Sequence, residues 1–248
     1  MIKFFRKIRQ KLFSENKFSK YLIYAIGEII LVVIGILIAL SINTWNQNRL
    51  NSNKEYYYLS QLKVELKNQN QEVNKRLERV SSVMNIIDTL WSDLNKKGRF
   101  NPSAELNSNL NRLLSGTNLE LYTTTFDELI STGQLTLISS DSLRTKVLLC
   151  YQEIKKSQEN IQNNSDNVFY TEIFPVISSF INFDYPQDMS SLVNQNYLSL
   201  KEQSRLAKAI YLNKAVFSAY KNMLMGIQEE ASSTIELIEL RLNNEIED

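Results

Sequence analysis

Few side chains in this chain could carry out catalysis or hold a metal. Its 248 residues include no histidine and one cysteine, so the commonest zinc and copper sites lack their ligands. The sequence also has no nucleophile elbow, no phosphate-binding glycine loop and no catalytic constellation built on histidine. Adjacent acids occur at Asp127 with Glu128 and at Glu229 with Glu230, but neighbours on a helix point to different faces and usually form a solvated surface. We therefore expect no enzymatic activity, no bound metal and no cofactor.

The single cysteine is expected to be structural. Cys150 lies in the segment RTKVLLCYQEI, where apolar residues recur at helical spacing. A cysteine in such a setting behaves as a small buried hydrophobic residue. A lone cysteine also excludes an internal disulfide, although an intermolecular one is possible in an oxidising compartment.

One further ionisable group is notable for its surroundings. Glu28 is the only charged residue in the apolar run 21–42. As an α-helix this run is about 33 Å long, which matches a membrane hydrocarbon core of about 30 Å. Tyr21 and Tyr24 at one end and Trp45 at the other have the positions of interfacial aromatic anchors. We therefore predict a single transmembrane helix and, for this chain, the lipid bilayer as a partner.

The distribution of charge predicts the orientation of this helix. Residues 1–20 carry seven Lys or Arg and one acid, whereas the chain from Asn43 onward carries 21 basic and 25 acidic residues. The positive-inside rule then makes residues 1–20 a cytoplasmic basic amphipathic segment, residues 21–45 an uncleaved signal anchor in the inner membrane, and residues 46–248 a periplasmic helical domain. A cleaved signal peptide ending near Ala39 is the alternative. Because the basic excess lies outside the domain, we expect no nucleic-acid binding.

Three interpretations of Glu28 remain open. It lies close enough to the interface to be hydrated, or it faces a partner helix, or it belongs to a proton or ion path formed by an oligomer. Small residues nearby favour close helix packing, since Gly27 precedes Glu28, and Gly35 with Ala39 forms a small-xxx-small pair. Glu28, Gly27, Gly35 and Ala39 are therefore the candidate residues for a transmembrane helix–helix contact with a second copy of the chain or with another membrane protein.

Heptad repeats predict a long helix at each end of the domain. Apolar residues recur every seven positions at Leu59, Leu66, Val73, Val80, Ile87 and Leu94, with Leu62, Val83 and Leu90 three positions further on. The polar residues Gln69 and Arg76 interrupt this second set. The same seven-residue spacing recurs at Ile210, Phe217, Leu224, Ala231 and Ile238. We predict an all-α fold, an elongated bundle or coiled coil with two long antiparallel helices that bracket shorter ones.

Caps and glycines mark the ends of the shorter elements. The predicted segments are a helix from Ser103 to Leu114, a short helix capped by Thr124 or Thr125 and closed by Gly133, an extended link QLTLI, and a helix from Ser140 to about Asn163. We interpret the corner made by the short helix and the link as a structural turn and not as a ligand site.

An aromatic run, VFYTEIFPVISSFINFDYP, follows the polar stretch NNSDN. The helical spacing of Ile173, Ile177 and Ile181 predicts a buried helix that is disturbed at Pro175. A second membrane-contacting element is the alternative, but the run after Glu172 is too short to span. The last helix is expected from roughly Leu200 to Ile246.

Two segments carry a family resemblance. The opening of the chain does so most closely at Gly27-Glu28-Ile29, Gly35-Ile36 and Asn43 to Asn46, and a looser likeness lies in FDELISTGQLTLI followed by LRTKVLLCYQEI. These segments resemble an uncharacterised, domain-of-unknown-function family of single-pass envelope membrane proteins in Gram-negative bacteria of the Bacteroidota type. The resemblance implies an envelope location and supplies no activity or catalytic residues.

The sequence thus favours a membrane-anchored, non-enzymatic interaction or scaffold protein. It would present a helical bundle to the periplasm, as a homo-oligomer or as part of an envelope complex. The alternative is an extracytoplasmic sensory or ligand-binding bundle that signals through a partner subunit, because only a short tail is predicted on the cytoplasmic side.

Overall fold

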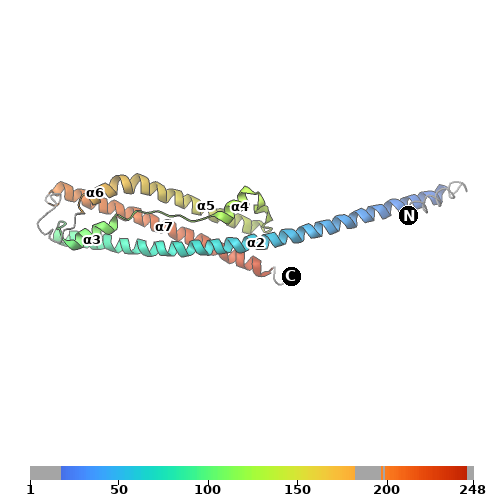
Figure 1. Ribbon diagram of the computed structural model, residues 1–248, viewed down its shortest axis with the longest axis horizontal. Coiled ribbons are helices and arrows are strands. Elements are labelled where there is room, and N and C mark those ends of the chain that lie inside the picture. Colours follow the sequence, from blue (N-terminus) through green and yellow to red (C-terminus); the bar gives the residue numbers. More distant parts are fainter. Residues whose placement is uncertain (1–17, 182–196, 198, 245–248) are drawn as a thin grey trace. The chain divides into compact units, whose positions relative to one another are not determined.

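The computed structural model describes residues 18–181, 197 and 199–244, and within these ranges it is all-α, as predicted. The chain divides after Glu55 into two compact units, 1–55 and 56–248. In chain order the elements are α2 (Phe18–Lys97), α3 (Ala104–Leu113), α4 (Thr124–Ser131), the 3₁₀ helix η1 (Gln134–Leu137), α5 (Asp141–Asn164), the π-helix η2 (Ser165–Ile173), α6 (Phe174–Ser178) and α7 (Leu200–Asn244) (Figure 1).

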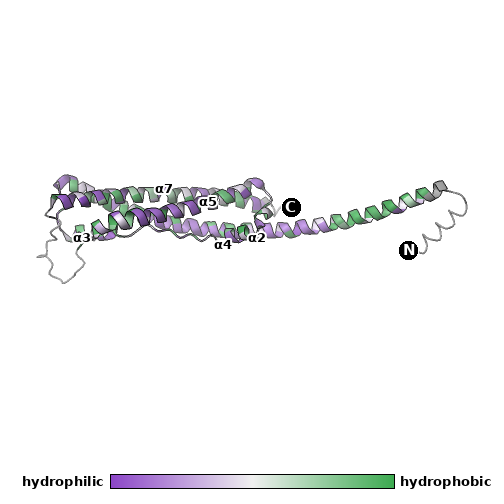
Figure 2. Cartoon of the chain, turned by 90° about the horizontal axis from the view of Figure 1, so that it is seen from above, coloured by the Kyte–Doolittle hydropathy of each residue, from purple (hydrophilic) through white to green (hydrophobic). Residues whose placement is uncertain are grey.

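The described part of the first unit is the N-terminal portion of α2. Here α2 is long enough and apolar enough to cross a membrane. Figure 2 shows hydrophobic colouring along the part of this portion nearer the N-terminus and hydrophilic colouring on the rest of it, whereas on the second unit the two alternate. The predicted amphipathic segment over residues 1–20 lies mostly outside the described residues.

In the second unit α7 runs antiparallel to the rest of α2, as the heptads predict. Side-chain contacts join the two helices along their length, from Lys67 with Glu239 through Asn70 with Ser232 and Asn74 with Gln228 to Asp88 with Lys214. From the second contact onward, each advance along α2 is matched by an equal step back along α7. The two helices therefore share one fixed antiparallel register.

The predicted heptad positions form the core of this unit. The α2 residues from Leu59 to Ile87 at seven-residue spacing have no exposed surface, and the corresponding α7 residues from Ile210 to Ile238 are at most 1% exposed. Leu94, the last of the α2 set, is partly buried against the same core. Burial of these side chains is the main favourable contribution to the stability of the bundle.

A third long helical run accompanies the two predicted long helices in the described residues. Helix α5 ends at Asn164, close to the predicted end at about Asn163, and the helical run continues without a loop through η2 into α6 (Figure 1). Its inward-facing residues are Ser157, Ile161, Ser165, Phe169, Ile173 and Ile177, which are spaced by four. In an α-helix that spacing rotates by roughly 40° at each step, so the wider turn of a π-helix keeps these residues on the core. The predicted helix is irregular, but the irregularity is the π-helix η2, which ends at Ile173, two residues before Pro175 in the first turn of α6.

The predicted caps are mostly confirmed, with two corrections. Ser103 and Ser140 cap α3 and α5 by accepting backbone hydrogen bonds, and Gly133 has the positive φ, 67°, that a closing glycine needs. The cap residue of α4 is Thr123 rather than Thr124 or Thr125. The predicted extended link QLTLI is instead the 3₁₀ helix η1, whose tighter turn lets Ile138 reach full burial directly after it.

Candidate functional site

The apolar part of α2 has almost no cover within the chain. Its large hydrophobic side chains from Leu22 to Ile42 are 47–72% exposed. The one hydroxyl group in its second half, Ser41, donates to the backbone oxygen of Leu37 at 2.8 Å, so it is satisfied within the helix. Such a continuous exposed apolar surface is far larger than isolated surface residues produce, and surfaces of this kind are typical of protein–protein or membrane interaction sites.

The predicted contact and anchor residues lie on this helix. A Cβ added at Gly27 or Gly35 would meet nothing within 4 Å, so both positions leave room for close approach of another helix. Glu28, Gly35 and Ala39 are seven and four residues apart and therefore lie on one face. The helix–helix contact itself stays a prediction.

Of the three predicted aromatic anchors, the structure describes the side chains of Tyr24 and Trp45. Tyr24 and Trp45 are 61% and 65% exposed, and Arg49 lies over the Trp45 ring at 5.6 Å. Tyr21 belongs to α2, but its side chain lies outside the described residues.

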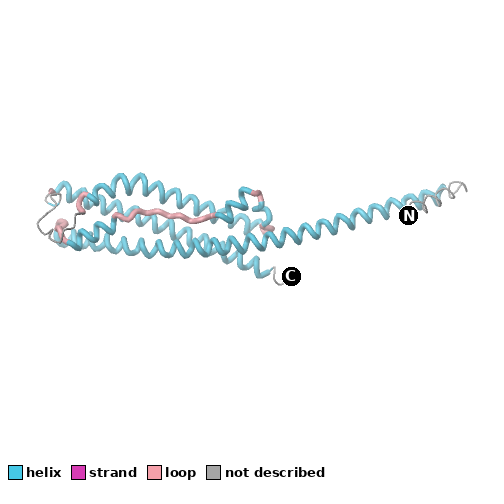
Figure 3. Tube along the Cα trace, in the orientation of Figure 1, coloured by secondary structure: helices cyan, strands magenta, loops and turns pink. Residues whose placement is uncertain are grey.

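In the second unit, residues 115–123 form an extended segment that we call the strap. It runs lengthwise between the ends of α3 and α4, and Figure 3 shows it as the long pink loop beside the helices. Its side chains alternate, since Thr117, Leu119 and Leu121 are at most 7% exposed and the residues between them point outward. The strap is thus seated on the core like a strand, without a neighbouring strand.

Side chains from all three long helices hold the strap by its carbonyl oxygens. From α2, Gln69 donates to the carbonyl oxygen of Tyr122 at 2.7 Å, and Arg76 donates to that of Asn118 at 3.4 Å. From α7, Tyr220 donates to the same Asn118 oxygen at 3.0 Å. From α5, Gln158 donates to the carbonyl oxygens of Leu119 at 3.5 Å and Leu121 at 3.4 Å. Buried and half-buried carbonyls need such partners because the strap has no ladder to supply them. Gln69 and Arg76, which interrupt the heptad pattern, therefore hold the strap.

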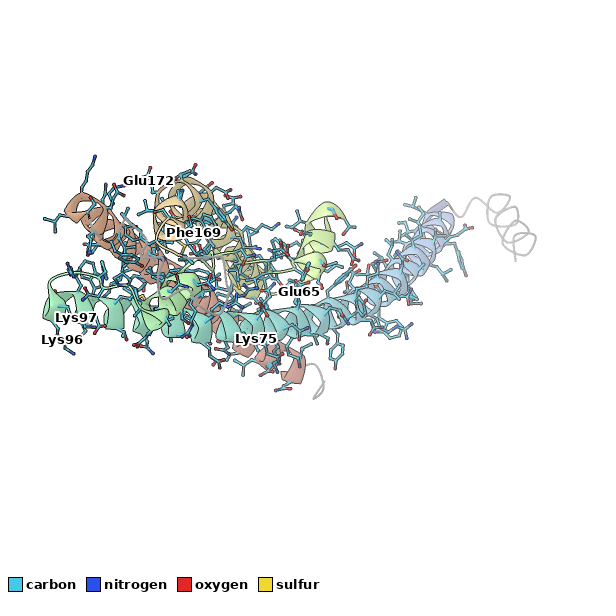
Figure 4. The ribbon with its side chains drawn as sticks, turned by 60° about the vertical axis from the view of Figure 1, so that its left-hand side comes forward. Glu65, Lys75, Lys96, Lys97, Phe169 and Glu172 are labelled. Carbon is cyan, nitrogen blue, oxygen red and sulfur yellow. The ribbon has the colours of Figure 1, made fainter. Side chains whose placement is uncertain are left out.

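Glu65 of α2 fixes the point where the strap enters α4. Its Oε1 accepts a 2.6 Å hydrogen bond from the Tyr151 hydroxyl of α5, and its Oε2 accepts one of 2.8 Å from the backbone nitrogen of Thr125 (Figure 4 labels Glu65). The Tyr151 ring stacks on Phe126 of α4, with centroids 4.3 Å apart. Burial, followed by the neighbouring Glu65 carboxylate, holds the pKa of Tyr151 far above its usual value, so the hydroxyl stays a donor.

A groove of about 510 Å³ lies between α2 and the outer side of the strap. Residues of α2 from Gln61 to Arg76 form one wall, and Glu120, Leu121, Tyr122 and Thr125 form the other. This volume is within the range of small-molecule sites, about 300–1,000 Å³. The lining is mostly polar, with amides, carboxylates and one guanidinium group beside a few apolar and aromatic side chains, so it offers both hydrogen-bond donors and acceptors.

The charges inside the groove are partly neutralised. Arg76 donates from Nε to Glu72 at 2.8 Å, and this hydrogen bond holds the pKa of Glu72 below its usual value. Glu65 is engaged by Tyr151 and Thr125. Glu120 makes no ion pair with any described residue. The groove therefore retains an excess of negative charge at the strap.

The groove was not found from the sequence, although two signals pointed towards it. Gln69 and Arg76 are polar residues at heptad positions that otherwise face the core, and Thr117, Leu119 and Leu121 alternate with residues that point outward. The corner of α4 and η1, interpreted as a structural turn, contributes only its Thr125 to the groove.

The remaining candidates for chemistry are buried or engaged by neighbouring side chains. Cys150 is fully buried, as predicted, and burial raises the pKa of its thiol to about 11. Of the predicted acid pairs, Asp127 lies 2.6 Å from Lys155, Glu128 accepts a 2.8 Å hydrogen bond from Tyr58, and Glu230 lies 2.6 Å from Lys146. Among the described residues no group of three acids or cysteines has an arrangement that could hold a metal ion.

Comparison with known proteins gives one match. A family model described as "Family of unknown function (DUF6090)" matches residues 28–174, from Glu28 in the apolar helix to Phe174 at the start of α6. No curated protein matches. No solved structure matches either.

Proposed function

We propose that this chain, which belongs to the family of unknown function DUF6090, is a membrane-anchored, non-enzymatic interaction protein. The observation that carries the proposal is the exposed apolar surface of α2 from Leu22 to Ile42. In water that surface would promote aggregation, whereas in a bilayer it is buried by lipid. The uncharacterised family is compatible with this role and adds no activity to it.

The location we propose is the inner membrane of a Gram-negative bacterium. The seven basic residues among the first 20 favour a cytoplasmic N-terminus, and the helical unit from Tyr56 onward then lies in the periplasm. A bacterium of the Bacteroidota type is the host that the resemblance implies.

The partner we propose is a second copy of the chain or another membrane protein, engaged through α2. Glu28 is costly within a lipid environment unless it is hydrated or paired, and Gly35 and Ala39 leave the same face open to close packing. A helix–helix contact would cover this face and bring the carboxyl group out of the lipid.

Cysteine labelling in intact cells tests the anchor and its orientation. Cys150 is buried and serves as the silent background, while Ser14→Cys and Ser81→Cys place a thiol before α2 and on the exposed surface of the second unit. An impermeant maleimide should label Ser81→Cys and leave Ser14→Cys unlabelled until the cells are lysed, with both proteins in the carbonate-resistant membrane fraction. The reverse labelling would refute the orientation, and extraction of the intact chain by carbonate would refute the anchor.

A second function, ligand binding by the bundle, is favoured by the groove between α2 and the strap. It is compatible with the first, since the two proposals use different units of the chain.

A further inference from the structure

Gln69, which lines the groove, carries a buried hydrogen-bond acceptor without a donor among the described residues. Gln69 is 4% exposed, and its Nε2 donates a 2.7 Å hydrogen bond to the carbonyl oxygen of Tyr122. Its Oε1 has no hydrogen-bond partner among the described residues. A buried acceptor left unpaired is destabilising, so this position favours a molecule that brings an N–H or O–H donor.

The rim of the groove favours a donor that carries positive charge. Glu120 is an exposed carboxylate of the strap without an ion pair to a described residue, and the Tyr122 side chain beside it is 75% exposed. A carboxylate attracts a cation directly, and the face of an aromatic ring attracts one through its quadrupole. Glu120 and Tyr122, on the same wall of the groove, thus both favour a positively charged group.

The one cation among the described lining residues is already engaged by neighbouring side chains. Arg76 is seven residues beyond Gln69 on α2, which is about 10 Å along the helix. It is held there by Glu72 at 2.8 Å and by the side-chain oxygen of Asn118 at 3.2 Å. Arg76 is thus paired with Glu72, and Glu65 and Glu120 are the lining carboxylates without an ion pair to a described residue.

We propose that this groove binds an organic cation, meaning an ammonium or guanidinium group on an apolar stem. The charged group donates to Gln69 Oε1 and pairs with Glu120, and the Tyr122 ring covers it. The stem lies against Val64, which is 52% exposed on the opposite wall. This binding site lies wholly in the second unit and does not depend on the membrane anchor.

Such a cation has two sources, a free amine and the Lys or Arg side chain of a polypeptide. The chemistry that the groove recognises is the same for both. Phenethylammonium serves as the free amine, and the tripeptide Gly-Lys-Gly with blocked termini serves as the side-chain form. Stronger binding of one of them identifies the source, and binding of either supports the proposal.

The test uses the full chain in micelles of an uncharged detergent. Titration calorimetry compares phenethylammonium with 2-phenylethanol, which has the same ring and stem without the charge. We expect the ammonium compound to bind at least tenfold more tightly and to raise the unfolding temperature of the protein. We also expect its affinity to fall with added salt, as a charged contact requires.

Matched variants locate the binding. Glu120→Gln should weaken phenethylammonium binding at least fivefold, whereas Glu159→Gln, an exposed acid of α5 outside the groove, should leave it unchanged. Both substitutions lie on the surface, so equal unfolding temperatures without ligand show that the fold is intact. Tyr122→Ala should also weaken binding and leave the fold intact, because its ring is exposed.

Three results would overturn the proposal. They are no binding of either cation, equal binding of the charged and uncharged compounds, and equal effects of Glu120→Gln and Glu159→Gln. The first result means that water alone satisfies Gln69. None of the three bears on the cysteine labelling, so failure here is separable from failure of the membrane anchor.

Discussion

The Tyr151 hydroxyl donates a 2.6 Å hydrogen bond to Oε1 of Glu65 and so joins α5 to α2 across 86 positions of sequence. The other oxygen of the same carboxylate accepts the backbone N–H of Thr125 at 2.8 Å, in the first turn of α4. One side chain thus ties together two long helices and the end of the strap, where the fold has no regular backbone hydrogen bonding.

Tyr151→Phe should therefore destabilise the bundle although it removes only one oxygen atom. The Glu65 oxygen is left without its donor in a partly buried position, which should reduce the free energy of unfolding by about 1–3 kcal/mol. Urea denaturation of the full chain in micelles measures the change. Tyr211→Phe is the control, because Tyr211 is 63% exposed, and an equal effect of the two variants would contradict the role of the hydrogen bond.

The loss of stability caused by substitutions in the strap should alternate from one residue to the next. Leu121→Ala removes a buried side chain from the core and should reduce the free energy of unfolding by about 2–4 kcal/mol. Glu120→Ala, one residue away on the outer side, should change it by no more than about 0.5 kcal/mol. Similar losses at both positions, measured by the same denaturation, would show that the strap is not seated by alternate residues.

Cys150 should be unreactive in the folded protein. Burial raises its pKa from 9.0 to about 11, so the folded state holds the thiol proton more tightly than the unfolded state. Its contribution to stability is complete below the unfolded pKa and is lost as the pH rises from about 9 through about 11. A chromogenic disulfide reagent at pH 8 should modify the thiol in urea and not in the native protein, and rapid native modification would refute its burial.

The carboxyl group of Asp127 should titrate below its ordinary pKa. Hydrogen bonds from Lys155 first, and from the Thr123 hydroxyl second, favour the charged form. Stabilisation by this group is present above the unfolded pKa and is lost as the pH falls through the lower, folded pKa. Lys155→Gln should raise the pKa of Asp127 in an NMR titration, whereas Lys156→Gln, whose lysine lies 3.6 Å from Glu153, should not.

The membrane helix offers a separate test. Glu28→Gln removes the charge and should leave insertion intact while weakening association of the chain in membranes, measured by cross-linking or by energy transfer. Gly35→Leu fills the space beside the same face and should have the same effect. If neither variant changes association, the pairing of Glu28 with a partner helix is wrong and its hydration at the interface accounts for the residue.

The buried faces of α2 and α7 were predictable from sequence because buried apolar residues recur every seven positions along each helix. Leu59 and its successors on α2, and Ile210 and its successors on α7, needed no knowledge of their neighbours. The groove was different, because it arises where Gln69 meets Tyr122, 53 residues away, and nothing local specifies that meeting.

The π-helix was missed for a related reason. The polar stretch NNSDN separates two predicted helices, yet Ser165 within it is 3% exposed. The four-residue spacing that runs through it to Ile177 was the stronger signal, because it reports which side of the chain is buried. Composition alone describes solvent exposure on average and does not say which residue of a polar stretch turns inward.

The strap also limits how the three long helices move past one another. A slide of one helix by a single residue along its axis is about 1.5 Å, enough to break a hydrogen bond of ordinary length. Since α2, α5 and α7 each donate to the strap, any such slide detaches at least one carbonyl oxygen. The strap therefore holds the three helices at fixed positions along their axes. A conformational change transmitted along the bundle must either keep these positions or detach residues 115–123 from the helices.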